Sequence, residues 1–167
     1  AGATLGTTDP PRHDRLRGLI QKAFTRRNLE GLAEPIRDIA RAAAQGLRGR
    51  REFDYIADFS SKFTVRVLFA ALGLPLEDEQ TVREKAVLMV QNDPVTRAKG
   101  PEHIAAFEWV RDYATRIIAI RRENPVNDLI SHFTHAEIDG DKLDDREVLL
   151  TTTTLIMAGI ESLGGFM

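Results

Sequence analysis

The segment that decides the fold is Asp9-Pro10-Pro11-Arg12-His13-Asp14-Arg15-Leu16-Arg17, near the start of the chain. An acidic residue followed by prolines is typical of a helix N-terminus, so we expect a helix from this segment to about Phe24. His13 and Arg17 are four residues apart and therefore project from the same helix face. They can donate charge-assisted hydrogen bonds to a carboxylate, whereas a solvated surface pair beside Asp14 is the commoner arrangement.

A second informative segment lies in the last expected helix. Residues 151–154 are four consecutive threonines, and Gly159 in the helix interior costs about 1 kcal/mol relative to alanine. Glu161 and Ser162 then add an acid and a hydroxyl to an apolar stretch. Two interpretations stay open: a groove beside a bound ligand, or a close-packed helix crossing in which Glu161 faces solvent.

The rest of the chain is also predicted to be helical, because apolar residues recur at spacings of three and four. Asp139-Gly140 is a hairpin-type turn, and Asp144 with Glu147 is a plausible cap for the last helix. The expected fold class is therefore mainly α, with at most a small β-hairpin. The expected helices cover about 9–24, 29–47, 59–72, 77–90, 101–120, 127–135 and 144 onward, with a short extended piece at 53–55. The expected buried face of the long helix is Ala106, Trp109, Val110, Tyr113, Ile117 and Ile120.

Composition points to one globular domain. The chain has 167 residues, 43% hydrophobic and 29% charged, and contains no cysteine. This length is enough to bury a core, so we expect residues 1–167 to form a single helical domain. The absence of cysteine excludes a disulfide, a thiolate nucleophile and a sulfur ligand for a metal from this sequence. No membrane span or signal peptide is recognisable, which favours a cytoplasmic location.

Charge is unevenly distributed along the chain. Residues 11–51 contain eleven Lys or Arg and four acidic residues, although the whole chain has a net charge of -2. A basic lobe of this kind can attract propionates, phosphates, nucleic acid or an acidic protein. A solvated helix face is the simpler explanation for most of these arginines.

Several motifs along the chain resemble those of bacterial cytochromes P-450, and they occur in the family's order. Collinear agreement over essentially the whole chain is more specific than any one motif. The matching segments are Thr8–Arg17 with Lys22–Thr25, Glu52–Asp54, Leu72–Pro75, Asn127–Ile130, Asp139–Leu143 and Ala158–Ser162.

The resemblance implies a partial cytochrome P-450 fold, from the loop before helix C through most of helix I. It implies that His13 and Arg17 hold the propionates of a heme, and that Ala158 and Gly159 lie against the heme. The family's N-terminal sheet region is absent from this sequence, and its Glu-x-x-Arg pair and cysteine-ligand half lie beyond this C-terminus. The chain is thus expected to be a truncated or fragmentary member.

The resemblance also places Glu161 and Ser162 at the acid and alcohol positions that assist proton delivery to dioxygen. Ser162 stands where threonine is usual, and Leu163 follows where a second small alcohol is common. Ser162 still offers a hydroxyl. Without a cysteine thiolate, however, iron receives no electron push toward O–O cleavage, so we expect this chain alone to be inactive.

The intact family member would be a monooxygenase that hydroxylates a small, mostly apolar substrate with O2. Its electrons would come from an acidic ferredoxin or flavodoxin, docked near the basic residues around helix C. Two alternatives stay open: a non-catalytic helical module that self-associates as a homodimer, and an all-helical ligand-binding or regulatory domain.

The four histidines do not predict a metal site. His132 and His135 are three residues apart on a short helix, but no third ligand is recognisable, so a solvent-facing pair is expected. The resemblance places none of the histidines as an axial heme ligand. No nucleic-acid-binding motif is present, and Trp109 with Tyr113 fits a core or pocket wall better than a base-stacking surface.

Overall fold

The computed structural model describes residues 4–93 and 96–166, with side chains as far as Ile160 in the last helix. Short 3-10 turns occur at Leu5–Thr7 and Leu76–Asp78, and a π-helical turn spans Tyr55–Ser60. A two-residue antiparallel ladder joins β1 (Glu137–Ile138) to β2 (Asp141–Lys142). The helices are α1 (Arg12–Ala23), α2 (Arg26–Glu30), α3 (Ala33–Gln45), α4 (Ser61–Leu72), α5 (Glu79–Val90), α6 (Pro101–Glu123), α7 (Leu129–His135) and α8 (Asp145–Phe166). The prediction of a mainly α fold with one small hairpin is confirmed.

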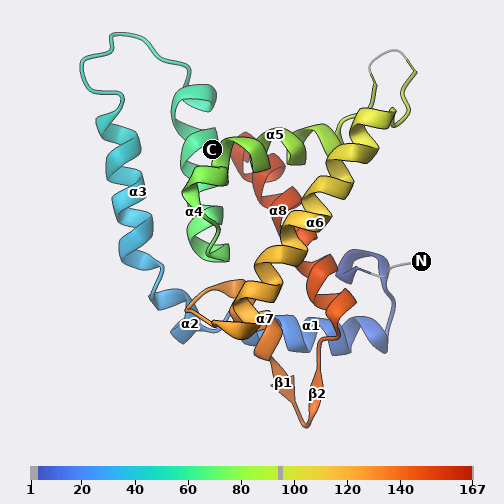
Figure 1. Cartoon of the computed structure of the whole chain (residues 1–167). Coiled ribbons are helices and arrows are strands. Elements are labelled where there is room, and N and C mark those ends of the chain that lie inside the picture. Colours follow the sequence, from blue (N-terminus) through green and yellow to red (C-terminus); the bar gives the residue numbers. More distant parts are fainter. Residues whose placement is uncertain (1–3, 94–95, 167) are drawn as a thin grey trace.

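Helix α8 is the centre of the arrangement. It packs against α4, α5, α6 and α7, while α1 packs on α7 and the hairpin at the lower end of the view (Figure 1). Helix α3 packs on α4 and stands at the edge of the molecule (Figure 1). The largest fully buried side chains include Phe69, Phe133, Leu19, Leu72, Ile130 and Ile156.

Local sequence signals account for several helix ends. Glu147 N–H donates to Asp144 Oδ1 at 2.7 Å, and Asp144 N–H donates to Glu147 Oε2 at 3.1 Å, which is the predicted capping box of α8. Gly73 ends α4 with φ +65°, a left-handed conformation that costs glycine little. The hairpin turn at Asp139 and Gly140 has φ +52° and +83°, as a type I′ turn requires.

Three local predictions are wrong. The expected helix over 29–47 is divided into α2 and α3, because Pro35 lacks the N–H that a continuous helix would need and sits in the first turn of α3. The expected extended piece at 53–55 forms no strand; Tyr55 instead begins a π-helical turn. Ile120 is exposed, since the buried side of α6 turns toward Ala114 and Ile118 near its end.

None of the helices in the described part of the chain combines the length and apolar character that crossing a membrane requires.

Candidate functional site

His13 and Arg17, the two residues predicted to donate hydrogen bonds to a carboxylate, lie on the outer side of α1. This helix buries Leu16, Leu19 and Ala23 against the core, which leaves Arg17 exposed and His13 partly exposed. His13 Nδ1 lies 3.0 Å from Asp14 Oδ1, so the carboxylate that the sequence placed beside it does contact it. The side chain of Arg17 has no hydrogen bond or ion pair with other described residues. The structure thus keeps both side chains accessible on one helix face, and their binding role stays a prediction.

Arg15 is a structural residue that the sequence did not single out. Its Nε and Nη2 donate to the two carboxylate oxygens of Asp141 at 2.6 and 2.7 Å, and its Nη1 donates to the buried Glu147 at 2.9 Å. These bonds lower the pKa of Asp141 below its usual range and raise that of Arg15. Arg15 therefore ties α1 to the hairpin and to the first turn of α8. Because its partners are more than 120 residues away in sequence, no local signal identifies it.

Adjacent residues of α8 face different surroundings. Gly159 is buried, and a Cβ at this position would lie 2.7 Å from Leu68 Cδ1 of α4. Ala158 is exposed. The close-packed helix crossing considered from sequence is therefore present at Gly159, while Ala158 carries the small accessible surface. Glu161 and Ser162 belong to α8, but their side chains lie outside the described part of the structure.

The histidines take part in local hydrogen bonds. The buried His103 accepts the Gly100 N–H at 2.9 Å and so caps α6. His132 Nε2 lies 3.1 Å from Asn127 Oδ1, and His135 Nδ1 lies 2.8 Å from the Ser131 carbonyl oxygen. Among the side chains that the structure describes, residues 4–93 and 96–160, no cluster of three or more His, Cys, Asp or Glu is arranged to hold a metal ion.

These residues fit the periphery of a heme but not its iron. An accessible arginine and histidine on α1 suit carboxylate groups, and Ala158 offers a small surface on α8. The sequence contains no cysteine, so a thiolate ligand cannot come from these 167 residues. These residues therefore suit contacts at the edge of a heme and provide no thiolate ligand for its iron.

A cavity of about 310 Å³ lies between the N-terminal half of α8, α6 and the end of α5. Apart from two arginines and three threonines, its wall is apolar. Such a lining suits a mostly apolar molecule. The lining residues are Thr4, Met89, Phe107, Arg111, Arg146, Leu149, Leu150, Thr153, Thr154 and Met157.

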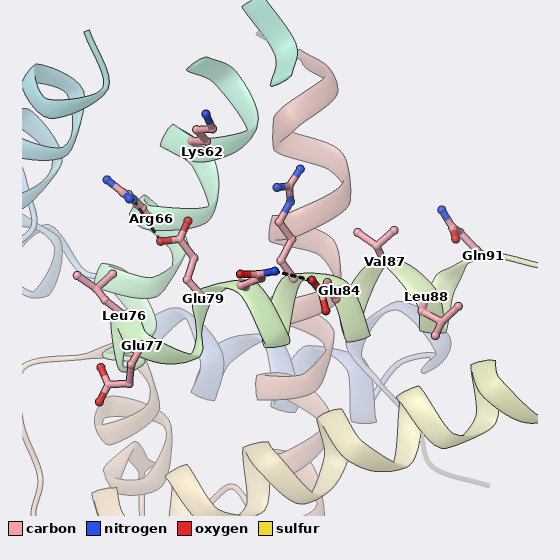
Figure 2. A pocket seen from close by; sticks show the side chains of 11 residues that line it. Lys62, Arg66, Leu76, Glu77, Glu79, Glu84, Val87, Leu88 and Gln91 are labelled. Atoms are coloured by element: carbon pink, nitrogen blue, oxygen red, sulfur yellow. Dashed lines mark hydrogen bonds and ion pairs between the residues drawn. The ribbon is translucent and has the colours of Figure 1, made fainter. Parts of the chain in front are cut away.

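A larger groove, of about 810 Å³, runs between α4 and α5, with Lys62 and Arg66 on one side and the length of α5 on the other (Figure 2). Some of its polar side chains pair with one another. Arg66 Nε lies 3.2 Å from Glu79 Oε2, and Gln80 donates to Glu84 at 2.9 Å. The wall of this groove is mostly polar, so it suits a mostly apolar ligand less well than the apolar cavity does.

Comparisons with known proteins agree on one family. No protein-family model matches the chain. The cytochrome P-450 CYP107DY1 of Priestia megaterium is 34% identical over 158 residues, which cover 93% of this chain and 38% of that protein. The structure of the bacillaene polyketide synthase cytochrome P-450 PksS of Bacillus subtilis superposes with a TM-score of 0.86 at 31% identity, covering 95% of this chain and 40% of that one. CYP109E1 of Bacillus megaterium in complex with corticosterone also gives a TM-score of 0.86, at 28% identity, over 96% of this chain and 44% of that one.

The match therefore spans almost all of this chain but 38% of the length of its first-named relative. Sequence identity above 30% extends over 93% of the chain, and the fold superposes over 95% of it. By these two measures the chain belongs to the cytochrome P-450 family.

Proposed function

We propose that this chain is the part of a heme-dependent monooxygenase that walls the substrate chamber and covers one side of the heme. The observation that carries the proposal is the apolar cavity along α8, immediately before the Ala158–Ser162 segment. A mostly apolar chamber next to the reacting centre suits hydroxylation of a small, mostly apolar substrate. O2 and electrons from a redox partner complete the reaction.

The heme, when bound, supplies the activation of dioxygen at iron, and it needs a thiolate from outside these residues. His13 and Arg17 would hold its propionates, as two donors on the accessible face of α1. Of the two predicted contacts on α8, Ala158 is the better supported, because the Cβ direction of Gly159 points to Leu68. Glu161 and Ser162 would hold and pass protons. On its own, the chain is expected to be inactive.

An acidic ferredoxin or flavodoxin is the proposed electron donor. Arg12 and Arg15 are engaged by Glu147, so they contribute less to an exposed basic surface. Arg17, Lys22 and Arg27 are exposed, and their charged groups have no hydrogen bond or ion pair with the described residues. These three cations on α1 and α2 are the surface that an acidic protein would contact.

Hemin titration of the purified chain tests the cofactor assignment. Arg17→Ala should weaken hemin binding by about tenfold, since it removes one charge-assisted contact, whereas the exposed α3 variant Arg37→Ala should not. The reduced, carbon-monoxide-treated sample should show no thiolate-type Soret band unless a cysteine-bearing segment is added. Equal hemin affinity in both variants would contradict the role of Arg17.

A second candidate function, a non-catalytic module that self-associates, is favoured by α3. Its apolar residues are at most half-buried, and an apolar groove of about 540 Å³ lies between α3 and α4. Such a face can pair with a second copy. Light scattering of the isolated chain should then show a dimer that Ile39→Asp converts to monomer, and a monomer at all concentrations would exclude this function.

A further inference from the structure

We propose that the groove between α3 and α4 binds a small amphiphile, an apolar chain that ends in a carboxylate, as a fatty acid does. This groove of about 540 Å³ adjoins a smaller cavity of about 180 Å³, since Ala42 and Arg66 line both. The apolar chain lies in the groove, and the carboxylate lies at the smaller cavity. Neither space shares a lining residue with the cavity along α8, so the inference does not depend on the proposed substrate chamber or on heme.

The wall of the groove suits an apolar chain. Ile39 contributes from α3, Phe69 from α4, and Leu76 from the turn before α5. Leu76 is 62% exposed, more than any other large apolar residue whose side chain the structure describes. A chain laid against it removes apolar surface from water, which is the main driving force for such binding. The acidic residue of the wall, Asp38, is paired with Arg41 at 2.9 Å and points its charge to solvent, at 71% exposure.

The smaller cavity supplies positive charge at one end of the groove. Its wall contains three cationic side chains, those of Arg50, Lys62 and Arg66, and one carboxylate, that of Asp58. Arg50 Nη2 lies 2.7 Å from Asp58 Oδ2, whereas Lys62 Nζ is 3.9 Å from this carboxylate, too far for a hydrogen bond. The excess of cations attracts an anionic group to this point, and Lys62 and Arg66 are left to bind it.

Lys62 and Arg66 can both reach a ligand. They are four residues apart and project from the same face of α4 (Figure 2). Arg66 Nε lies 3.2 Å from Glu79 Oε2, but its two terminal nitrogens have no hydrogen bond or ion pair with described residues. The Lys62 and Arg66 side chains are 55% and 47% exposed. Their free N–H groups can therefore donate charge-assisted hydrogen bonds to a carboxylate at the end of the groove.

The experiment compares two probes with the same apolar chain, decanoate and decan-1-ol. Their dissociation constants for the purified chain are measured at pH 7.5 by isothermal titration calorimetry. We expect decanoate to bind about tenfold more tightly, the value of one hydrogen bond to a charged group. Arg66→Gln should remove most of this preference, and Lys62→Gln should reduce it. Arg83→Gln is the matched control, because Arg83 is an exposed cation of α5 that lines neither the groove nor the smaller cavity.

Two further variants locate the bound probe. Ile39→Asp should weaken the binding of both probes, because it places a charge in the apolar wall of the groove. Arg111→Gln changes a cation of the cavity along α8 and should leave the preference for decanoate intact. Loss of the preference in Arg111→Gln, or unchanged binding in Ile39→Asp, would mean that decanoate binds elsewhere and would overturn the proposal.

The unmodified chain can also contradict the proposal. Equal binding of the two probes, no binding of either, or a preference that persists in Arg66→Gln would overturn it. A dimer that binds no decanoate would assign the groove to a second copy of the chain instead. The assay contains no heme, so failure of the heme assignment and failure of the amphiphile site are separate results.

Discussion

The α6–α7 junction and helix α3 both contain an arginine paired with an aspartate, in very different surroundings. At the junction, Arg121 Nε lies 2.5 Å from Asp128 Oδ2, and the side chains are 17% and 2% exposed. On α3, Arg41 lies 2.9 Å from Asp38, with exposures of 65% and 71%. If one partner is removed, water can solvate the remaining charge at the exposed pair but not at the buried pair. An arginine–aspartate pair is therefore important for the structure of the α6–α7 junction and contributes little to that of α3.

The two regions also differ in how far their apolar residues are buried. Helix α7 is short but buries Leu129, Ile130 and Phe133. Helix α3 has a regular apolar face, yet none of its residues is fully buried. Regular spacing shows which face of a helix can be buried, but neighbouring elements decide how much of it is.

The largest expected effect is that of Asp128→Ala. Asp128 also accepts the Ser131 N–H at 2.7 Å, so the variant loses the cap of α7 and leaves Arg121 buried without its partner. The free energy of unfolding should fall by about 3–5 kcal/mol in urea denaturation. Asp38→Ala should change it by less than about 0.5 kcal/mol, and similar losses in the two variants would remove the contrast.

Truncating one isoleucine in each region tests the apolar side of the comparison. Ile130→Ala, at a fully buried position, should cost about 3 kcal/mol because it leaves a cavity. Ile39→Ala on α3 should cost about 1 kcal/mol, since its side chain is only half-buried. Equal costs by denaturant titration would show that α3 is covered in solution.

Two glycines with positive φ distinguish the cost of a left-handed backbone from the cost of a steric clash. A Cβ at Gly73 would lie 2.0 Å from Asp128 Oδ2, whereas one at Gly49, after α3, would meet no atom within 4 Å. Gly49→Ala should cost about 1 kcal/mol, the price of left-handed backbone alone. Gly73→Ala should cost about 1–2 kcal/mol more, because Asp128 must move. Thermal denaturation of the two variants gives the difference directly.

The smallest effect concerns pH in the connection between α3 and α4. The Arg50 guanidinium, 2.7 Å from Asp58, lowers the pKa of that carboxyl. A lowered folded-state pKa adds stability above the unfolded value of about 4, and this is lost as pH falls through the folded value. The thermal midpoint of Asp58→Asn should therefore depend less on pH in this acid range. With Arg50→Ala as background, the Asp58→Asn substitution should no longer alter the pH dependence.

Much of the fold could be predicted because its signals are local. Asp9-Pro10-Pro11, Gly73, Pro101 and the Asp139-Gly140 turn each act within one turn of the backbone, and the predicted boundaries there are close. Pro35 is also a local signal for the separation of α2 from α3. The apolar periodicity over 29–47 nevertheless predicted one continuous helix.

The remaining features depend on contacts between distant segments. Arg15 and Arg121 read as ordinary surface arginines until the fold brings Glu147 and Asp128 to them. For the site, sequence placed His13 and Arg17 on one accessible face, but the orientation of Gly159 toward Leu68 required α4. The four threonines marked α8 as unusual, but only the tertiary structure places Thr153 at a cavity and Thr152 away from it.

Neighbouring positions on a helix point about 100° apart, so Ala158 and Gly159 face different surroundings. The size of residue 159 is coupled to that of residue 68, since the two share the contact between α8 and α4. Among homologues, an alanine at 159 should accompany a smaller side chain at 68. Ala158 is exposed, so a different side chain there would change the accessible surface of α8 rather than the contact of Gly159 with Leu68.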